Sequence, residues 1–369
     1  MSTNRLFIAS AGSGKTTLII NDIVDKQSER VLITTFTIAN AESIKERILR
    51  ENKGLFPSNI TVQTWFSFLL EHGVRPYRWW NKQVSGMQLV SAASAVYLGE
   101  ENNFYQHYFN NDMSVYSDKI SKLTCRCNDN SSGQVIKRLE KIYKHIYIDE
   151  VQDMAGWDYE ILRMVMTSSI NLTMVGDPRQ AVYSTHPDRK YQKYNNGKVL
   201  DFIKGECKKI GCNIDEQSLN CTYRNSNEIC ALSSRLYPAL PSCESKLKLT
   251  NSHMGVYFIK KKDVENYLSA LDGIVQLRND KRTKGIVPNF DVLNFGISKG
   301  LEFNHVLIFP TKPIMEWLKN NNAELKDKSC ADLYVAITRA KFSVGFVVDD
   351  SFSMSIEGIS FWDNNKTNI

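Results

Sequence analysis

The sequence lacks an apolar stretch approaching the ~20 residues that a membrane-spanning helix requires, so we expect no membrane partner. Its eight cysteines include no C-x-x-C pair and have no histidine nearby at ligand spacing, which argues against a zinc site. There is no internal repeat, low-complexity tract or leader segment with a charged region before an apolar one. These absences predict a cytoplasmic protein with free thiols.

The chain has 369 residues, which is long enough for two or three domains that each bury a core. Its 46 basic and 40 acidic residues give a formal net charge of +6. An excess of this size suits a polyanionic partner such as a nucleic acid but does not require one.

Short apolar runs alternate with helical segments along the chain, which predicts α/β lobes with parallel sheets. Strands are expected at residues 6–9, 31–34, 60–62, 146–148 and 172–175 and, after a polar loop at 186–198, at 256–259, 292–294, 306–309 and 344–348. Residues 75–139 show no strand signal and are expected to form a mainly helical insertion. The expected domains are a first lobe at 1–75 and 140–205, a reduced helical insertion at 76–139 and a second lobe at 214–369.

Residues 9–16 (ASAGSGKT) form a loop of small residues between the first expected strand and the first expected helix. Such a loop lets successive backbone N–H groups point at phosphate oxygens. Lys15 supplies a positive charge for the β- and γ-phosphates, and Thr16 offers a hydroxyl to Mg²⁺. The predicted nucleotide site comprises Ala11, Gly12, Ser13, Gly14, Lys15, Thr16 and Thr17.

A second acidic element ends the expected strand at residues 146–148. Asp149 is placed to hold Mg²⁺ through water, and Glu150 to orient or deprotonate the attacking water. With the phosphate loop, this pair predicts a P-loop nucleoside triphosphatase.

The residues around Glu150 also carry a family resemblance. Residues 149–153 (DEVQD) are similar to the D-E-x-Q-D motif of UvrD/Rep-like superfamily-one helicases. Six further motifs lie before and after this one, and all seven occur in this family's order. They are at residues 35–41 (TFTIANA), 64–67 (TWFS), 175–183 (VGDPRQAVY), 223–226 (YRNS), 299–303 (KGLEF) and 333–340 (LYVAITRA). The resemblance implies two tandem RecA-like P-loop lobes with the insertion in the first, and ATP and Mg²⁺ as cofactors.

The resemblance also implies roles for individual side chains. Gln180 would sense the γ-phosphate, and Gln152 would lie beside the hydrolytic water. Arg224 and Arg339 would reach the γ-phosphate, where an arginine finger is worth about 10³–10⁵ in rate. Glu302 would contact the nucleotide ribose.

In this family single-stranded DNA crosses both lobes, which implies a DNA-binding set of Phe36, Thr37, Asn40, Thr64, Trp65, Phe66 and Tyr183. Aromatic stacking contributes about 1–3 kcal/mol per base. Residues 183–187 (YSTHP) and 294–296 (NFG) nevertheless depart from the family pattern on the DNA-facing side. The glutamine-bearing segment that recognises adenine is also expected to be missing, which leaves adenine selectivity in doubt.

Two functions remain open at this point. The first is a DNA-dependent ATPase that translocates 3′ to 5′ on single-stranded DNA, or on DNA with single-stranded ends, and unwinds it. The second is a nucleotide-switched, DNA-sensing subunit that controls a partner nuclease, as in compact UvrD-like proteins of antiviral systems such as Gabija. The altered DNA-facing motifs favour the second, and the complete set of ATP-facing residues favours an active ATPase in both.

Overall fold

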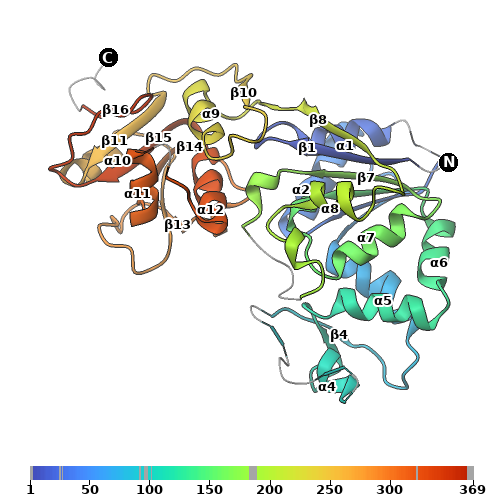
Figure 1. Cartoon of the computed structure of the whole chain (residues 1–369). Helices are drawn as coiled ribbons and strands as arrows, with labels where there is room; N and C mark the ends of the chain where they lie inside the picture. Colours follow the sequence, from blue (N-terminus) through green and yellow to red (C-terminus); the bar gives the residue numbers. More distant parts are fainter. Residues whose placement is uncertain are drawn as a thin grey trace. The chain divides into compact units, whose positions relative to one another are not determined.

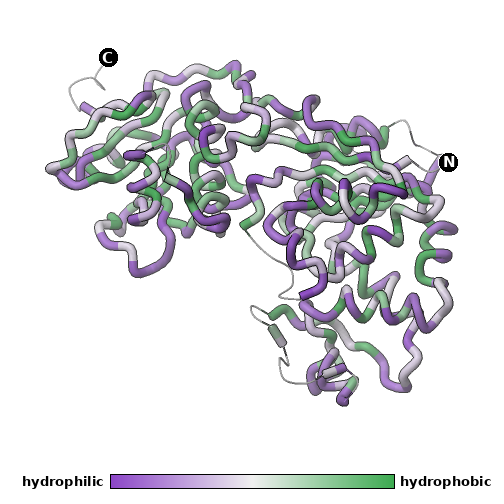
Figure 2. Tube along the Cα trace, in the orientation of Figure 1, coloured by the Kyte–Doolittle hydropathy of each residue, from purple (hydrophilic) through white to green (hydrophobic). Residues whose placement is uncertain are grey.

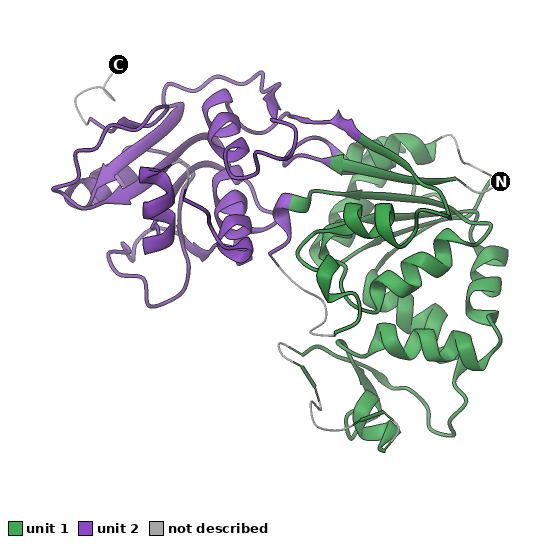
Figure 3. Cartoon of the chain, in the orientation of Figure 1, with its two compact units in different colours: residues 1–8, 15–178, 183–215 green, residues 9–14, 179–182, 216–369 purple. Residues whose placement is uncertain are grey.

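The computed structural model describes residues 3–24, 26, 28–90, 93–94, 99–100, 102–182, 189–320 and 323–363. The chain divides into two compact units, each built on its own six-stranded sheet (Figure 3). Unit 1 contains residues 1–8, 15–178 and 183–215, and unit 2 contains residues 9–14, 179–182 and 216–369. The expected α/β class with two tandem RecA-like lobes is therefore confirmed. The boundaries expected from the sequence, including those of the insertion, stay predictions.

The sheet of unit 1, whose strands β1, β7 and β8 are labelled in Figure 1, has the strand order β3-β2-β6-β7-β1-β8. Its central strands are fully or almost fully buried, which is why they read as near-continuous apolar runs. The strands are β1 (Asn4–Ala9), β2 (Val31–Thr35), β3 (Ile60–Thr64), β6 (His145–Asp149), β7 (Asn171–Gly176) and β8 (Asn213–Leu219), the last divided between the units.

Helices connect these strands and complete unit 1. They are α1 (Lys15–Val24), α2 (Ile38–Glu51), α3 (Trp65–Phe68), α7 (Asp158–Met166) and α8 (Val199–Gly205). A π-helical segment, Leu69–Val74, continues α3 and packs against α5 (Ile120–Asn130).

The region predicted as the insertion contains α4 (Phe104–Tyr108), α5 and the start of α6 (Gln134–Ile142). It also contains two short strands that the sequence did not indicate, β4 (Gly86–Gln88) and β5 (Ser114–Tyr116), which pair in parallel. Each has only three residues, too few for a recognisable alternation of apolar and polar side chains.

Unit 2 has a parallel sheet in the order β13-β12-β14-β15-β11-β16. The strands are β11 (Gly255–Lys260), β12 (Ile274–Arg278), β13 (Val292–Asn294), β14 (Phe303–Ile308), β15 (Ala340–Val348) and β16 (Ser360–Phe361). The helices are α9 (Asn227–Ser234), α10 (Val264–Ser269), α11 (Lys312–Lys319) and α12 (Asp327–Thr338), and a small sheet pairs β9 (Cys221–Thr222) with β10 (Glu244–Ser245).

Hydrophobic residues follow the strands of both units, and hydrophilic residues occupy much of the connecting chain (Figure 2). Each sheet therefore sits inside its own core, which is the expected arrangement for a parallel sheet with helical crossovers. Among the described residues, no helix is both long enough and apolar enough to cross a membrane.

Candidate nucleotide and nucleic-acid sites

Three neighbouring strands of unit 1 end at the segments that carry the predicted ATP-facing motifs. β6, β7 and β1 are adjacent in the strand order and run parallel. Because the carboxyl ends of parallel strands meet at one edge of a sheet, the segments that follow begin at the same edge. These segments are the phosphate loop after β1, the Asp149–Glu150 pair after β6 and residues 177–180 after β7.

The phosphate loop has the backbone geometry that its glycines allow. Gly12 and Gly14 have φ of 69° and 89°, in the left-handed region that side chains disfavour. A Cβ on Gly12 would also come within 2.5 Å of Thr222 Oγ1 and 2.7 Å of the Arg224 Cβ. Neither close approach would be possible with a larger residue, so the sequence of the loop matches its path.

Ser13 gives the loop a polar atom without a partner. Its side chain is buried at 4% exposure, and its hydroxyl has no hydrogen-bond partner within the described chain. A buried hydroxyl without a partner is costly unless a ligand supplies the missing bond. The loop therefore fits a group rich in hydrogen-bond acceptors.

Glu150 stands directly after β6 in a strained backbone conformation. Its φ of 60° places a residue with a long side chain in the left-handed region, which costs of the order of 1 kcal/mol or more. The conformation turns its carboxylate to within 3.9 Å of Lys15 Nζ, and both side chains are largely buried. The carboxylate of Asp149 accepts a 3.0 Å hydrogen bond from the Glu150 backbone N–H.

Gln152 connects Glu150 to the end of β7. The N–H₂ of its side chain donates to the Glu150 carboxylate, and the Oε1 of the same side chain accepts from the Asp177 N–H at 3.1 Å. Gly176 leaves the space for this bridge, because a Cβ there would lie 2.4 Å from Gln152 Oε1. In the structure Gln152 therefore orients Glu150, in addition to the role beside the water that the family resemblance implies.

In unit 2 three motifs gather at the amino edge of the sheet. Glu302 precedes β14 and Arg339 precedes β15, and these strands are paired at Phe303 and Ala340. The Asn225 amide reaches the same edge, since it donates to Thr338 O at 3.1 Å and to Ala340 O at 2.6 Å. The motifs at residues 223–226, 299–303 and 333–340 are thus neighbours.

Arg224 and Glu302 form an ion pair at this edge. Burial alone would raise the pKa of Glu302, but the charges of Arg224, Lys341 and Arg339 and the hydrogen bond from Arg224 hold it below its ordinary value. Glu302 therefore carries a negative charge and holds Arg224. Arg224 Nε is buried with no hydrogen-bond partner in the described part of the chain.

Arg339 is 1% exposed and is fixed by several bonds. Its Nε donates to Val335 O and its Nη1 to Leu301 O, both at 3.1 Å, while Nη2 donates to Gln180 Oε1 at 3.4 Å. The structure thus brings Gln180 and Arg339 together, as it does Lys15 and Glu150. Thr16 is half-buried, and Thr17 is exposed and accepts from the Arg47 side chain at 2.7 Å.

Comparison with known proteins agrees with this geometry. A model of the UvrD/REP helicase N-terminal domain matches residues 1–72 and 76–186. The chain belongs to the UvrD/Rep helicase family. A probable DNA helicase II homolog of Mycoplasma capricolum is 23% identical, and the match covers 69% of this chain and 41% of that protein.

Two further members of the UvrD/Rep family are similar over a smaller part of the chain. The ATP-dependent DNA helicase Rep of Buchnera aphidicola subsp. Schizaphis graminum is 24% identical, with 48% of this chain and 35% of that protein covered. The Escherichia coli protein of the same name is 23% identical, with 48% and 34% covered. The chain thus spans less than half the length of the UvrD/Rep relatives that it matches.

The UvrD/Rep motifs predicted to face DNA begin helices α2 and α3. Thr37 caps α2 by accepting from the Asn40 N–H at 3.1 Å, and Thr64 caps α3 by accepting from the Ser67 N–H at 3.2 Å. The Asn40 amide donates to Thr35 Oγ1 at 3.5 Å. Thr37 is exposed, while Asn40 and Thr64 are half-buried. The polar residues of this UvrD/Rep set therefore also stabilise the helix starts.

The aromatic residues of the set differ in exposure. Trp65 is 1% exposed, its indole N–H donates to Asp158 Oδ1 at 2.7 Å, and its ring packs against Phe68. Its ring belongs to the core in this conformation, and its contact with a base stays a prediction. Phe36 and Phe66 are half-buried against that core. Tyr183 lies outside the described residues.

Two residues of the UvrD/Rep motifs make loop contacts that the sequence did not reveal. Arg179 donates to Ala9 O at 3.3 Å, and the Tyr334 hydroxyl accepts from the Ala11 N–H at 3.3 Å. Arg179 is 3% exposed. The contact of Arg179 could have been predicted only from the presence of an arginine in a motif of small and polar residues. No feature of the sequence distinguished Tyr334 from a tyrosine of the core.

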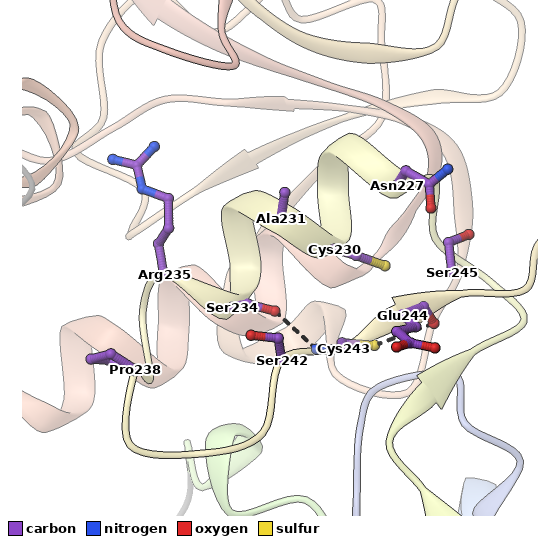
Figure 4. Close-up of a pocket in the computed structure, with 10 residues that line it drawn as sticks. All are labelled: Asn227, Cys230, Ala231, Ser234, Arg235, Pro238, Ser242, Cys243, Glu244 and Ser245. Carbon is purple, nitrogen blue, oxygen red and sulfur yellow. Dashed lines mark hydrogen bonds between the residues drawn. The ribbon is translucent and has the colours of Figure 1, made fainter.

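A surface cavity of about 740 Å³ lies along α9, and none of the predicted site residues lines it (Figure 4). The Cys243 N–H donates to the Ser234 hydroxyl at 3.1 Å, which ties the segment after residue 240 to the helix. Cys230 and Cys243 both line the cavity, and the contact with Cys243 together with burial raises the pKa of the Cys230 thiol. A raised pKa makes a thiol unreactive. The lining residues are Asn227, Cys230, Ala231, Ser234, Arg235, Pro238, Ser242, Cys243, Glu244 and Ser245.

Proposed function

We propose that the chain is a DNA-dependent ATPase of the UvrD/Rep family that translocates on DNA or unwinds it with 3′–5′ polarity. The observation that carries the proposal is Glu150, which is held in a strained conformation beside Lys15 at the end of the phosphate loop. A costly conformation at the residue predicted to act as the base supports a catalytic role. The names of relatives such as the ATP-dependent DNA helicase Rep add support.

The donor set of this chain fits ATP and Mg²⁺. The glycine-shaped loop and the unpartnered Ser13 hydroxyl suit the phosphates of ATP, and Lys15 adds a positive charge. Thr16 and Asp149 supply the hydroxyl and carboxylate oxygens that Mg²⁺ prefers. When bound, Mg²⁺ would neutralise charge that develops between the β- and γ-phosphates.

The remaining steps belong to side chains of the protein. Glu150, oriented by Gln152, would accept the proton of the attacking water. Arg339 and Arg224 would stabilise negative charge on the transferred phosphoryl group. Arg224 Nε supports that role, since it has no hydrogen-bond partner among the described residues. Gln180, bound to Arg339, would report the state of the γ-phosphate.

We further propose that single-stranded DNA binds at the helix starts of unit 1. Thr37, Asn40 and Thr64 offer polar groups to phosphates there. Phe36 and Phe66 are half-buried and would offer ring faces to bases.

The test is a steady-state ATPase assay with and without defined oligonucleotides. We expect single-stranded DNA to raise the rate several-fold, and Glu150→Gln or Lys15→Ala to abolish it. Unchanged turnover in both variants would remove the nucleotide-site assignment. A normal ATPase that ignores every nucleic acid would favour the alternative of a regulatory subunit for a partner nuclease.

A further inference from the structure

Arg179 is a buried cation that donates hydrogen bonds to the phosphate loop. At 3% exposure, its guanidinium donates through Nη1 to Ala9 O and to Ser10 Oγ, both at 3.3 Å. Its Nη2 donates to Pro241 O at 2.8 Å. Burying a guanidinium costs several kcal/mol unless hydrogen bonds compensate, and a methionine would fill similar space without that cost. Two of its hydrogen bonds compensate this cost on the phosphate loop itself.

Tyr334 of α12 holds the next residue of the same loop. Its hydroxyl accepts from the Ala11 N–H at 3.3 Å, and the residue is 2% exposed. The Arg179 guanidinium lies 5.9 Å from the centre of the Tyr334 ring, within cation–π range. Tyr237 packs edge-on against that ring, with centroids 5.7 Å apart, and its hydroxyl donates to Arg179 O at 3.3 Å.

The backbone of the loop is tethered in the same region at two further points. The Ser10 N–H donates to Leu219 O at 2.9 Å, and the Tyr223 N–H donates to Gly12 O at 3.0 Å. With Arg179 and Tyr334, these bonds fix each of residues 9–12. The loop segment before Ser13 therefore has a defined path, which is the condition for its later N–H groups to be preorganised for phosphate.

The same two segments of the chain are linked twice. Arg179 contacts Tyr334, and its neighbour Gln180 accepts from Arg339, which follows α12. Tyr334 and Arg339 are five positions apart on that segment. Arg179 and Tyr334, which form the first link, both contact the phosphate loop, and the second link includes the predicted arginine finger, Arg339. A shift of the loop would therefore reach Arg339 through a short and well-packed path.

We propose that Arg179 and Tyr334 are positioning residues that hold residues 9–11 of the phosphate loop in the form that binds nucleotide. This inference rests on the proposed ATPase function and deepens it. Neither residue touches the reacting atoms in this role. Both act on affinity, by fixing the loop before the nucleotide arrives.

The experiment is a titration with a fluorescent ATP analogue in Mg²⁺ that measures both the dissociation constant and the number of sites. Tyr334→Phe removes only the hydroxyl, and we expect the dissociation constant to rise about fivefold, as for one hydrogen bond. Arg179→Lys keeps the charge but loses the planar fork, and we expect a rise of about tenfold or more. Both variants should still bind one analogue per folded chain.

The matched control is Tyr267→Phe, which removes a buried tyrosine hydroxyl elsewhere in unit 2. It should leave the dissociation constant within about twofold of the wild type, since it keeps every loop contact. A merely structural role for Arg179 or Tyr334 would lower the number of sites and the melting temperature at an unchanged dissociation constant.

The outcomes separate the two proposals. If the wild type binds the analogue and both variants bind it equally well, the positioning role is wrong while the nucleotide site stands. If the wild type itself fails to bind and resembles Lys15→Ala, the proposed ATPase function fails first.

Discussion

At the residue scale, Gly176 and Glu150 are linked through one side chain. Gln152 donates to the Glu150 carboxylate and accepts from the Asp177 N–H, and it occupies the space that a Cβ on residue 176 would need. The sequence predicted that Glu150 follows a strand, but it did not predict which residue would orient it. The sequence shows Gly176 only as part of a motif, whereas the structure gives a steric reason for a glycine at this position.

Gly176→Ala should therefore slow hydrolysis strongly. The added methyl group would meet Gln152 Oε1 at 2.4 Å and displace the side chain that orients Glu150. A misplacement of about 1 Å can cost roughly 10²-fold in rate, so we expect a loss of that order in kcat. Gly86→Ala is the matched control, because the nearest atom to a Cβ there is Ser114 Oγ at 3.7 Å. Equal rates in the two variants would contradict the steric argument.

At this scale, contacts between residues far apart in the sequence were the hardest feature to predict. Lys15 and Glu150 were expected together because the chemistry of phosphoryl transfer requires both. Arg179 and Tyr334 were not expected together, because they are 155 positions apart in the sequence and no periodicity predicts their contact. The burial of Trp65 was not predictable for a related reason: its motif indicated a DNA contact, and only the structure shows its contacts with Asp158 and Phe68 in the core.

At the scale of elements, two buried histidines lie near each other, His253 just before β11 and His305 within β14. His253 Nε2 lies 3.1 Å from the Tyr267 hydroxyl, and His305 Nδ1 lies 2.7 Å from Ser343 Oγ. Burial lowers the pKa of His253 to about 4. Burial and the charge of His253 lower the pKa of His305 to about 4, although Asp272 acts in the opposite direction. Both side chains are therefore neutral in the folded protein.

This arrangement predicts a loss of stability in mild acid. In the unfolded chain both histidines titrate near pH ~6.5. Their contribution to the free energy of unfolding is complete above that pH and falls as the pH drops from about 6.5 towards about 4. Urea unfolding at about pH 7 and about pH 5 measures this fall. In His253→Gln the free energy of unfolding should change less with pH than in the wild type, with a slope smaller by at most about 1.4 kcal/mol per pH unit. The same slope in variant and wild type would contradict it.

Elements were predictable where their pattern was regular. The strands β2, β6, β7, β11, β14 and β15 were expected because buried parallel strands read as apolar runs. β12 was missed because its residues 274–278 (IVQLR) include a buried glutamine, Gln276, whose amide donates to Val287 O at 2.8 Å. β8 was missed because its residues 213–219 (NIDEQSL) are mostly polar, as suits a strand at the edge of a sheet.

At the scale of the whole molecule, the net charge of +6 bears on the proposed DNA partner. Binding that neutralises phosphates weakens with salt, with a slope of about −0.7 per contact for single strands. We expect at least a tenfold loss of affinity between roughly 50 and 200 mM salt, as three or more contacts would give. Fluorescence anisotropy with a labelled oligonucleotide measures it. Lys15→Ala should keep the slope, and an affinity independent of salt would exclude a phosphate-tracking surface.

The predicted functional motifs lie at the carboxyl ends of the strands in one sheet and at the amino ends of the strands in the other. In unit 1 the motifs follow the carboxyl ends of the strands, whereas in unit 2 Glu302 and Arg339 precede β14 and β15. No strand described in unit 2 is followed by a glycine-rich phosphate loop of its own. If the proposed function holds, each polypeptide carries one hydrolytic centre, and the stoichiometry is one nucleotide consumed per chain per cycle. The sheet of unit 1 is thus followed by the phosphate loop, whereas the sheet of unit 2 is preceded by Glu302 and by the predicted arginine finger, Arg339.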